Sequence, residues 1–180
     1  HLADYLKFNS KILKTDFIAF DTLDICESHN VYVPYVNINN YILETFGSFT
    51  YSHYASILVE KILQIEKHSE KRSLYIHVNQ EHFEIITTNK GALEFYNTFL
   101  YSSTEDFIYY ILFVFEQLKL NTETTQITLS GLINKDDELY SSLYIYVRHV
   151  KFINTTFNFS LTDSQNNNSL QHNYLILNSF

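Results

Sequence analysis

The chain contains no methionine and no tryptophan, and only one cysteine, one proline and three glycines. A single cysteine, Cys26, cannot close an internal disulfide, so the sequence predicts a reducing, cytoplasmic location. Three glycines are too few for a glycine-rich loop that holds phosphate, because such loops need a close backbone approach. The sequence also lacks the serine-hydrolase pattern G-x-S-x-G, the zinc pattern H-E-x-x-H and the Walker glycine–lysine loop. No residue is therefore assigned a catalytic role.

Positive charge is also scarce. The chain has 12 Lys and Arg against 20 Asp and Glu, which gives a formal net charge of −8. An acidic surface repels phosphate backbones, so we expect no nucleic-acid partner. The longest apolar run, residues 107–115, is shorter than the roughly 18 residues that a membrane span requires, so no transmembrane segment is expected. The sequence begins with His1 rather than methionine, from which we expect further sequence upstream.

Aromatic residues are abundant, with 15 Tyr and 15 Phe, and 46% of the chain is hydrophobic. This composition supports a folded core rather than global disorder. Residues 73–79, 82–88 and 92–99 are rich in β-branched and aromatic residues, and short turn signals separate them. Gly91 suits the second turn, because glycine adopts a positive φ without steric cost. These segments predict a meander of three antiparallel strands.

The region after the meander alternates between helical and extended patterns. Ser103 is a good N-cap for a helix that runs to about Lys119, since acidic residues fill the first turn. A short strand over 126–130 ends at Gly131, and a helix is predicted over 137–150, with basic residues at its end. The sequence then predicts a strand over 152–161, a polar loop over 162–171 and a short apolar end piece over 172–180.

The region before the meander is less regular. Residues 2–8 fit either a short helix or a strand, and both remain open. Strands are predicted over 17–20 and 30–34, an extended segment over 49–54, and helices over 37–46 and 55–67. The polar stretch 68–72 is the best candidate boundary, so we expect one domain portion over residues 1–69 and another over 70–180.

The helix over 104–119 carries apolar residues on every face, which is unusual for a helix packed on a single sheet. One interpretation is a central helix that is covered on two sides within one domain. The other is a surface for a protein partner or for another subunit, or a face that further sequence upstream covers. Helices of this kind are often simply buried, which favours the first interpretation. For the second interpretation the candidate contact residues are Tyr109, Tyr110 and Phe113.

The hairpin at 77–82 brings two histidines and a glutamate together in sequence, which raises the question of a metal site or metal-dependent hydrolysis by His77, Glu81 and His82. Structural zinc usually has four nitrogen or sulfur ligands, and no second cluster with ligand spacing occurs elsewhere. Polar residues at the surface of a hairpin explain these side chains better. We therefore predict no metal ligands.

Several sequence segments together resemble an uncharacterised bacterial family of unknown function that has the architecture of the actin-like ATPase superfamily. That superfamily includes actin, the heat-shock chaperone ATPases, the sugar kinases and the pilus-assembly ATPase-like proteins. The matching segments are 4–9, 30–34, 105–112, 115–118 and 129–131, and the resemblance extends from Leu2 to about Val150. It implies an α/β fold of actin-like (ribonuclease H-like) half-domains with mixed sheets flanked by helices. Residues 1–69 would end an incomplete first half, and 70–180 would form the second.

The same resemblance bears on nucleotide binding. Active superfamily members carry Asp-x-Gly near the first hairpin, where the acid handles a metal ion and the glycine admits phosphate; His77 and Asn79 match those positions here. Members also have Gly-Gly at the turn that contacts adenosine, where this chain has Gly131 and Leu132. Both departures remove groups that nucleotide chemistry uses, and a fold alone does not determine function.

We therefore expect a non-catalytic binding or scaffold protein that contacts a protein partner or a second copy of itself and needs no cofactor. The alternative is an ATP-binding protein that takes ATP with magnesium in the cleft between its halves. In that case Asn79, Gln80, Ser130 and Gly131 would line the nucleotide site.

Overall fold

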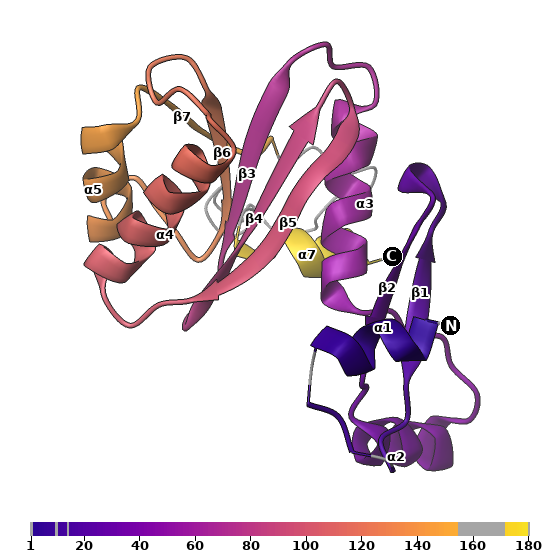
Figure 1. The fold of residues 1–180 in the computed structure, drawn as a ribbon. Coiled ribbons are helices and arrows are strands. Elements are labelled where there is room, and N and C mark those ends of the chain that lie inside the picture. Colours follow the sequence, from indigo (N-terminus) through magenta and orange to yellow (C-terminus); the bar gives the residue numbers. More distant parts are fainter. Residues whose placement is uncertain (1, 10, 14, 155–171, 180) are drawn as a thin grey trace. The chain divides into compact units, whose positions relative to one another are not determined.

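The structure, a computed structural model, describes residues 2–9, 11–13, 15–154 and 172–179. It divides into two compact units, His1–Lys61 and Ile62–Phe180, and helix α3 (Tyr54–Glu66) contains the point of division. Figure 1 shows the elements of both units along the chain. Among the described residues, no helix is long and apolar enough to cross a membrane.

The second unit is built on a mixed sheet of five strands in the order β5-β4-β3-β6-β7. Strands β3, β4 and β5 form the antiparallel meander, while β6 pairs parallel with β3 and β7 pairs parallel with β6. The strands are β3 (Arg72–Val78), β4 (His82–Asn89), β5 (Ala92–Leu100), β6 (Gln126–Gly131) and β7 (His149–Phe152). The three predicted meander strands and the short strand that ends at Gly131 are therefore confirmed, with shifts of one or two residues at their ends. The chain has the predicted α/β class, with a mixed sheet flanked by helices.

The predicted helix over 137–150 is wrong in its last four residues, 147–150. Helix α5 (Glu138–Tyr146) ends early because Val147 is extended, with φ −123° and ψ 131°. The N–H of Arg148 then donates to the carbonyl of Thr122, and His149 starts strand β7 beside β6. Basic residues that seemed to end a helix therefore lie in a turn and a strand. Strand β7 ends at Phe152, the first residue of the strand predicted over 152–161, and the next two residues belong to no strand. The residues after 154 lie outside the described part, as does the whole of the predicted loop over 162–171.

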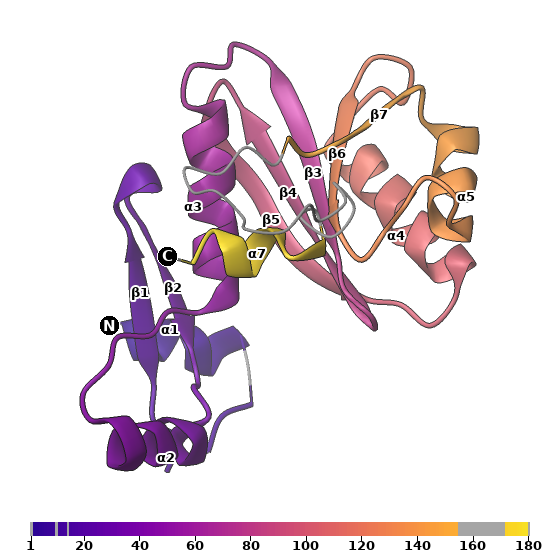
Figure 2. The same cartoon turned by 180° about the vertical axis from the view of Figure 1, so that it is seen from behind.

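The core of the second unit lies between the sheet and helix α4 (Thr104–Gln117). Ser103 is the N-cap as predicted, and its hydroxyl accepts a hydrogen bond from the N–H of Asp106. Phe107 and Ile111 are fully buried and face Ile76, Val78 and their neighbours. Helix α5 packs beside α4, whereas the short helix α7 (Tyr174–Leu177), within the predicted apolar end piece, lies on the opposite face of the sheet (Figure 2).

The first unit consists of short elements. These are α1 (Leu2–Asn9), the hairpin of β1 (Ala19–Leu23) and β2 (Ser28–Tyr32), a 3-10 turn η1 (Asp24–Cys26), α2 (Val36–Phe46) and the beginning of α3. Residues 2–8, left open by the sequence, are thus helical. The strands predicted over 17–20 and 30–34 exist, but they are displaced toward the turn that joins them. Residues 49–53 form no regular element, and α3 follows them directly.

The carboxylate of Asp21 organises the first unit. It accepts hydrogen bonds from the hydroxyls of Tyr32 and Ser56 and from the N–H of His53. Burial and this carboxylate together raise the pKa of the Tyr32 phenol, so the phenol remains a donor. One acidic side chain thereby joins the hairpin to the start of α3.

Candidate functional site

A row of three polar side chains crosses the three inner strands of the large sheet, near the ends of β3 and β6. Glu84 on β4, His77 on β3 and Ser130 on β6 occupy directly opposed positions, because β3 pairs with both neighbours in the corresponding register. All three are buried, with exposed fractions of 0%, 3% and 4%. Side chains alternate between the two faces of a strand, so this row lies on the face opposite the core residues Ile76 and Val78. It lies next to the hairpin that the resemblance matches to the phosphate-binding hairpin.

The two side chains at one end of this row bind each other. His77 Nδ1 lies 2.9 Å from Ser130 Oγ, which is hydrogen-bonding distance. A serine beside a histidine has the geometry of a nucleophile and its general base. Here both side chains are buried, and the contact satisfies two polar groups that burial would otherwise leave unpaired. The arrangement indicates a structural pair in the sheet.

The other end of the row continues into the β3–β4 turn. The side-chain amide nitrogen of Asn79 lies 3.1 Å from Glu84 Oε2 and 3.2 Å from His82 Nε2. Glu84 Oε1 lies 3.3 Å from the same His82 nitrogen. The backbone of Asn79 is also engaged, since its N–H donates to the carbonyl of His82 and its carbonyl accepts from the Tyr101 hydroxyl. Asn79 is therefore held inside the hairpin.

The buried imidazole of His77 has a consequence for pH dependence. Burial, and secondarily the nearby His82, lowers the pKa of His77 from 6.5 to about 4. Between pH 6.5 and about pH 4, His77 therefore binds a proton in the unfolded chain but not in the folded chain. The free energy of unfolding falls as the pH falls through this range. Since one pKa unit corresponds to about 1.4 kcal/mol, the loss from this group is on the order of 3 kcal/mol.

We expect urea unfolding to show this loss between about pH 7 and about pH 4. The matched variant is His77→Gln, which keeps a polar side chain but cannot titrate. Its unfolding free energy should fall less steeply than that of the wild type over the same range. Equal slopes for the two proteins would mean that His77 is not a buried neutral imidazole.

Gly131 ends β6 and turns the chain at this edge of the site. Its φ is +84°, and a Cβ built on it would lie 2.1 Å from the carbonyl oxygen of Val78. The same carbonyl accepts the N–H of Leu132 at 2.7 Å. No side chain fits here, so glycine allows the backbones of β3 and β6 to meet at their ends.

The residues predicted for a nucleotide site are brought together only in part. Ser130 and Gly131 lie beside the end of β3, opposite His77 and Val78. Asn79 is half-buried with its polar groups engaged in the hairpin, and Gln80 is exposed at the turn. The structure therefore places two of the four side by side and turns Asn79 inward.

The arrangement also bears on the hairpin metal hypothesis. His77 binds Ser130 within the sheet, whereas His82 lies against Glu84 and Asn79. Across the part of the chain that the structure describes, no group of three or more His, Cys, Asp and Glu side chains is placed to hold a metal ion. The two histidines thus have separate partners. The sequence analysis did not single out Glu84. A charged residue among the apolar residues of a predicted strand was the signal that could have identified it as a buried polar group.

The predicted contact residues lie on one exposed side of α4. Tyr109 and Phe113 are 62% and 43% exposed and stack with their ring centroids 6.3 Å apart. Tyr110 is half-buried and stacks on Phe99 of β5 at 5.0 Å, and its other ring neighbour is Tyr109 at 5.3 Å. We call Tyr109, Tyr110 and Phe113 the α4 aromatic face. Helix α4 is therefore buried on one side and leaves aromatic rings in solvent on the other.

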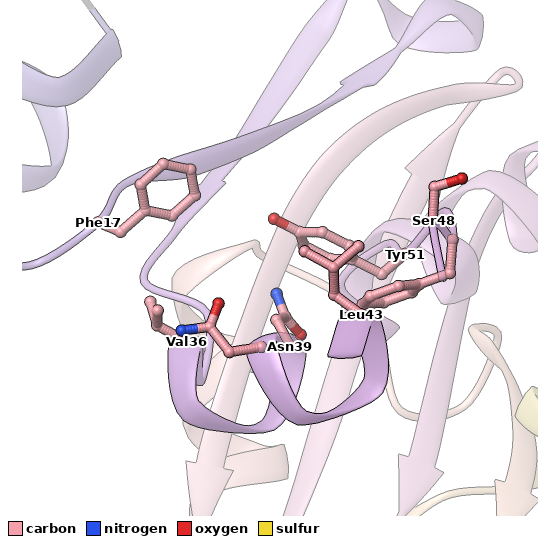
Figure 3. A pocket seen from close by; sticks show the side chains of 8 residues that line it. Phe17, Val36, Asn39, Leu43, Ser48 and Tyr51 are labelled. Atoms are coloured by element: carbon pink, nitrogen blue, oxygen red, sulfur yellow. The ribbon is translucent and has the colours of Figure 1, made fainter. Parts of the chain in front are cut away.

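The first unit contains a pocket that the sequence did not suggest. It has a volume of about 310 Å³ and lies along α2 and the segment that follows it. Figure 3 shows Val36, Asn39 and Leu43 of α2 on one side, with Phe17, Ser48 and Tyr51 completing the wall. Val36 and Leu43 are spaced for one helix face, which was the available signal. The lining combines apolar side chains with hydrogen-bonding groups, which are two asparagine amides and the hydroxyls of Ser48 and Tyr51.

Solved structures with similar folds include a Bacteroides thetaiotaomicron protein described as having an actin-like ATPase fold and unknown function. It is 19% identical, with a TM-score of 0.75 over 84% of this chain and 59% of that one. An AlfA filament bound to AMPPNP is 11% identical, with a TM-score of 0.40 over 64% of this chain and 41% of that one. The first match confirms the predicted actin-like fold, and the chain spans 59% of that protein's length.

Comparison with protein families gives a match over most of the chain. The model of the family described as "Protein of unknown function (DUF3822)" matches residues 1–150. No curated protein matches the chain. The predicted resemblance to an uncharacterised family with actin-like architecture is therefore confirmed.

Proposed function

Because the chain belongs to the DUF3822 family of proteins of unknown function, we propose from its own residues that it is a non-catalytic binding or scaffold module. The observation that carries this proposal is the α4 aromatic face. Its two outer rings, Tyr109 and Phe113, stack in solvent while the opposite side of the same helix is in the core. Exposed clustered aromatic rings are typical of surfaces that other proteins cover.

The chemistry of the hairpin supports the absence of catalysis. Active members of the superfamily that this chain resembles have an acid and a glycine at the first hairpin. This chain has His77, which is bound to Ser130, and Asn79, which is bound to Glu84, at those positions. Neither side chain presents a free carboxylate to a metal ion. The turn after β6 has Leu132 after Gly131, and the N–H of Leu132 is already bonded to Val78. These groups support the sheet and leave little to bind phosphate.

The experiment that tests the proposal is thermal unfolding with and without millimolar ATP and magnesium. We expect no change in Tm. A ligand present at 100 times its Kd would stabilise the native state by about 2.7 kcal/mol, which corresponds to several degrees. A clear upward shift would overturn the non-catalytic assignment and favour the alternative, an ATP-binding protein with Ser130 and Gly131 in its site. The control is magnesium alone, which separates nucleotide binding from a general salt effect.

We also propose that the chain is divided into actin-like half-domains over residues 1–69 and 70–180 and that it is located in the cytoplasm. Its partner is either another protein or a second copy of the chain.

A further inference from the structure

Strand β5 is an edge strand with an unusual sequence. Among the described residues its sole strand partner is β4, and its other side is the edge of the sheet (Figure 1). Residues 95–100 contain no charge, no proline and no glycine. Natural edge strands usually carry charges, prolines or bulges that prevent pairing with another strand. An uncharged β-forming segment of about six residues at an edge is suited to pair.

Protective features are present, but only at the start of β5. The register with β4 shifts between Thr87 and Thr88, so Glu94 is an extra, bulged residue. The Glu94 carboxylate also forms an ion pair with Arg72. The bulge and the charge protect the beginning of the strand, whereas the part after Glu94 lacks both. The segment available for pairing is therefore residues 95–100.

The backbone of this segment has a donor that faces away from β4. The N–H of Tyr101 donates to the carbonyl of Glu81, and bonded pairs alternate with non-bonded pairs along an antiparallel ladder. Thr98 and Leu100 are therefore in non-bonded pairs, with their backbone groups directed outward. In agreement, the N–H of Thr98 donates to the side-chain oxygen of Asn97 at 3.0 Å. A second strand would supply a carbonyl to this donor.

We propose that residues 95–100 pair antiparallel with the same residues of a second copy of this chain, which would join two sheets edge to edge. The inference rests on the proposed function and names its partner. About a two-fold axis at Thr98, Thr98 opposes Thr98 of the second copy, and Tyr96 opposes its Leu100. Such cross-strand pairs are favourable. Leu100, which is 75% exposed in the single chain, is then covered.

The distribution of charge favours this edge as the place where a second copy binds. The chain carries a net charge of −8, so most of its surface repels a second copy. The uncharged edge over 95–100 is where two acidic chains approach at the least electrostatic cost. In the two-fold register Glu94 opposes Ser102 of the second copy, whose N–H and hydroxyl donate to the Asp106 carboxylate. The ion pair of Glu94 with Arg72 offsets this acidic neighbour.

The proposed contact is continuous with the α4 aromatic face. Phe99, inside the pairing segment, stacks on Tyr110, and Tyr110 contacts Tyr109. The edge strand supplies directed hydrogen bonds and the helix supplies apolar area. This combination is the strand-addition mode of recognition, in which backbone bonds give affinity and side chains give specificity.

The test is sedimentation velocity from about 1 to 200 µM, which reports whether the chain of 21.3 kDa reaches twice that mass. The variant is Thr98→Pro, because proline removes the outward N–H without removing a bond to β4. Its matched control is Thr98→Val, which keeps the N–H at the same position. We expect the wild type and Thr98→Val to dimerise, and Thr98→Pro to weaken dimerisation about tenfold or more.

A second measurement does not depend on a variant that folds. In wild-type protein, hydrogen exchange at the amides of Thr98 and Leu100 should slow as protein concentration rises. A wild type that stays monomeric, or a dimer that Thr98→Pro leaves intact, would overturn the pairing. The nucleotide experiment tests the proposed function separately. If the chain is monomeric and ATP leaves its Tm unchanged, only the proposal of a second copy as the partner fails. If ATP raises the Tm, the proposed non-catalytic function fails.

Discussion

Replacing Phe107 with alanine is expected to lower the free energy of unfolding by about 3–5 kcal/mol. Phe107 is 0% exposed and meets Phe83 edge-on with ring centroids 4.7 Å apart, and Tyr101 lies at 5.7 Å. Truncation leaves a cavity that these rings cannot close, because each is held by the sheet or by its own partners. In a domain of this size each kcal/mol corresponds to about 2–4 °C in Tm.

The matched control is Phe113→Ala, the same substitution on the same helix. Phe113 is 43% exposed and its ring contact is with Tyr109 at the surface, so the loss should be below about 1 kcal/mol. Urea unfolding of both variants measures the difference. If Phe113→Ala costs as much as Phe107→Ala, the α4 aromatic face is part of the core and the proposed binding surface fails.

Gly131→Ala is expected to cost about 2–5 kcal/mol, because two penalties act together. A positive φ costs an L-residue about 1–2 kcal/mol, and overpacking a close contact costs about 1–3 kcal/mol. The new Cβ would lie 2.1 Å from the backbone oxygen of Val78 and 2.9 Å from its nitrogen. Since both atoms belong to the central strand, relief requires β3 and β6 to separate at the candidate site.

Gly91→Ala is the control within the same unit. Its φ is +76°, similar to that of Gly131, but its closest contact would be 2.9 Å, to the carbonyl oxygen of Glu66 at the end of α3. The conformational penalty is therefore shared, while the steric penalty is smaller. We expect the loss of unfolding free energy to be clearly larger for Gly131→Ala. Equal losses would show that the close approach of β3 and β6 contributes nothing.

The strands of the meander and the start of α4 were predictable from local residues. Their β-branched and aromatic runs, the turn glycine Gly91 and the N-cap Ser103 act within a few positions of one another. The helix over 137–150 was mispredicted for the opposite reason. No residue within that segment requires His149 to be extended. His149 is extended because it pairs with β6, which is remote in sequence.

The candidate site depends on the same kind of distant pairing. The resemblance pointed to His77, Asn79, Ser130 and Gly131, but not to how they are paired. Parallel pairing of β3 with β6 places Ser130 opposite His77, and antiparallel pairing of β3 with β4 places Glu84 on its other side. Which side of α4 is buried also could not be read from a helix that is apolar all round.

The sequence by itself determined the α/β class, the order of the elements in the meander and the turn position at which Gly91 is required. These follow from local propensity and from the conformational freedom of a single residue type. Only the tertiary structure decided that His77 is a buried neutral partner of Ser130, that Tyr109 and Phe113 remain exposed, and that β5 forms an edge. The physical reason is that burial and strand pairing depend on residues far apart in the chain, whose contacts no local pattern specifies.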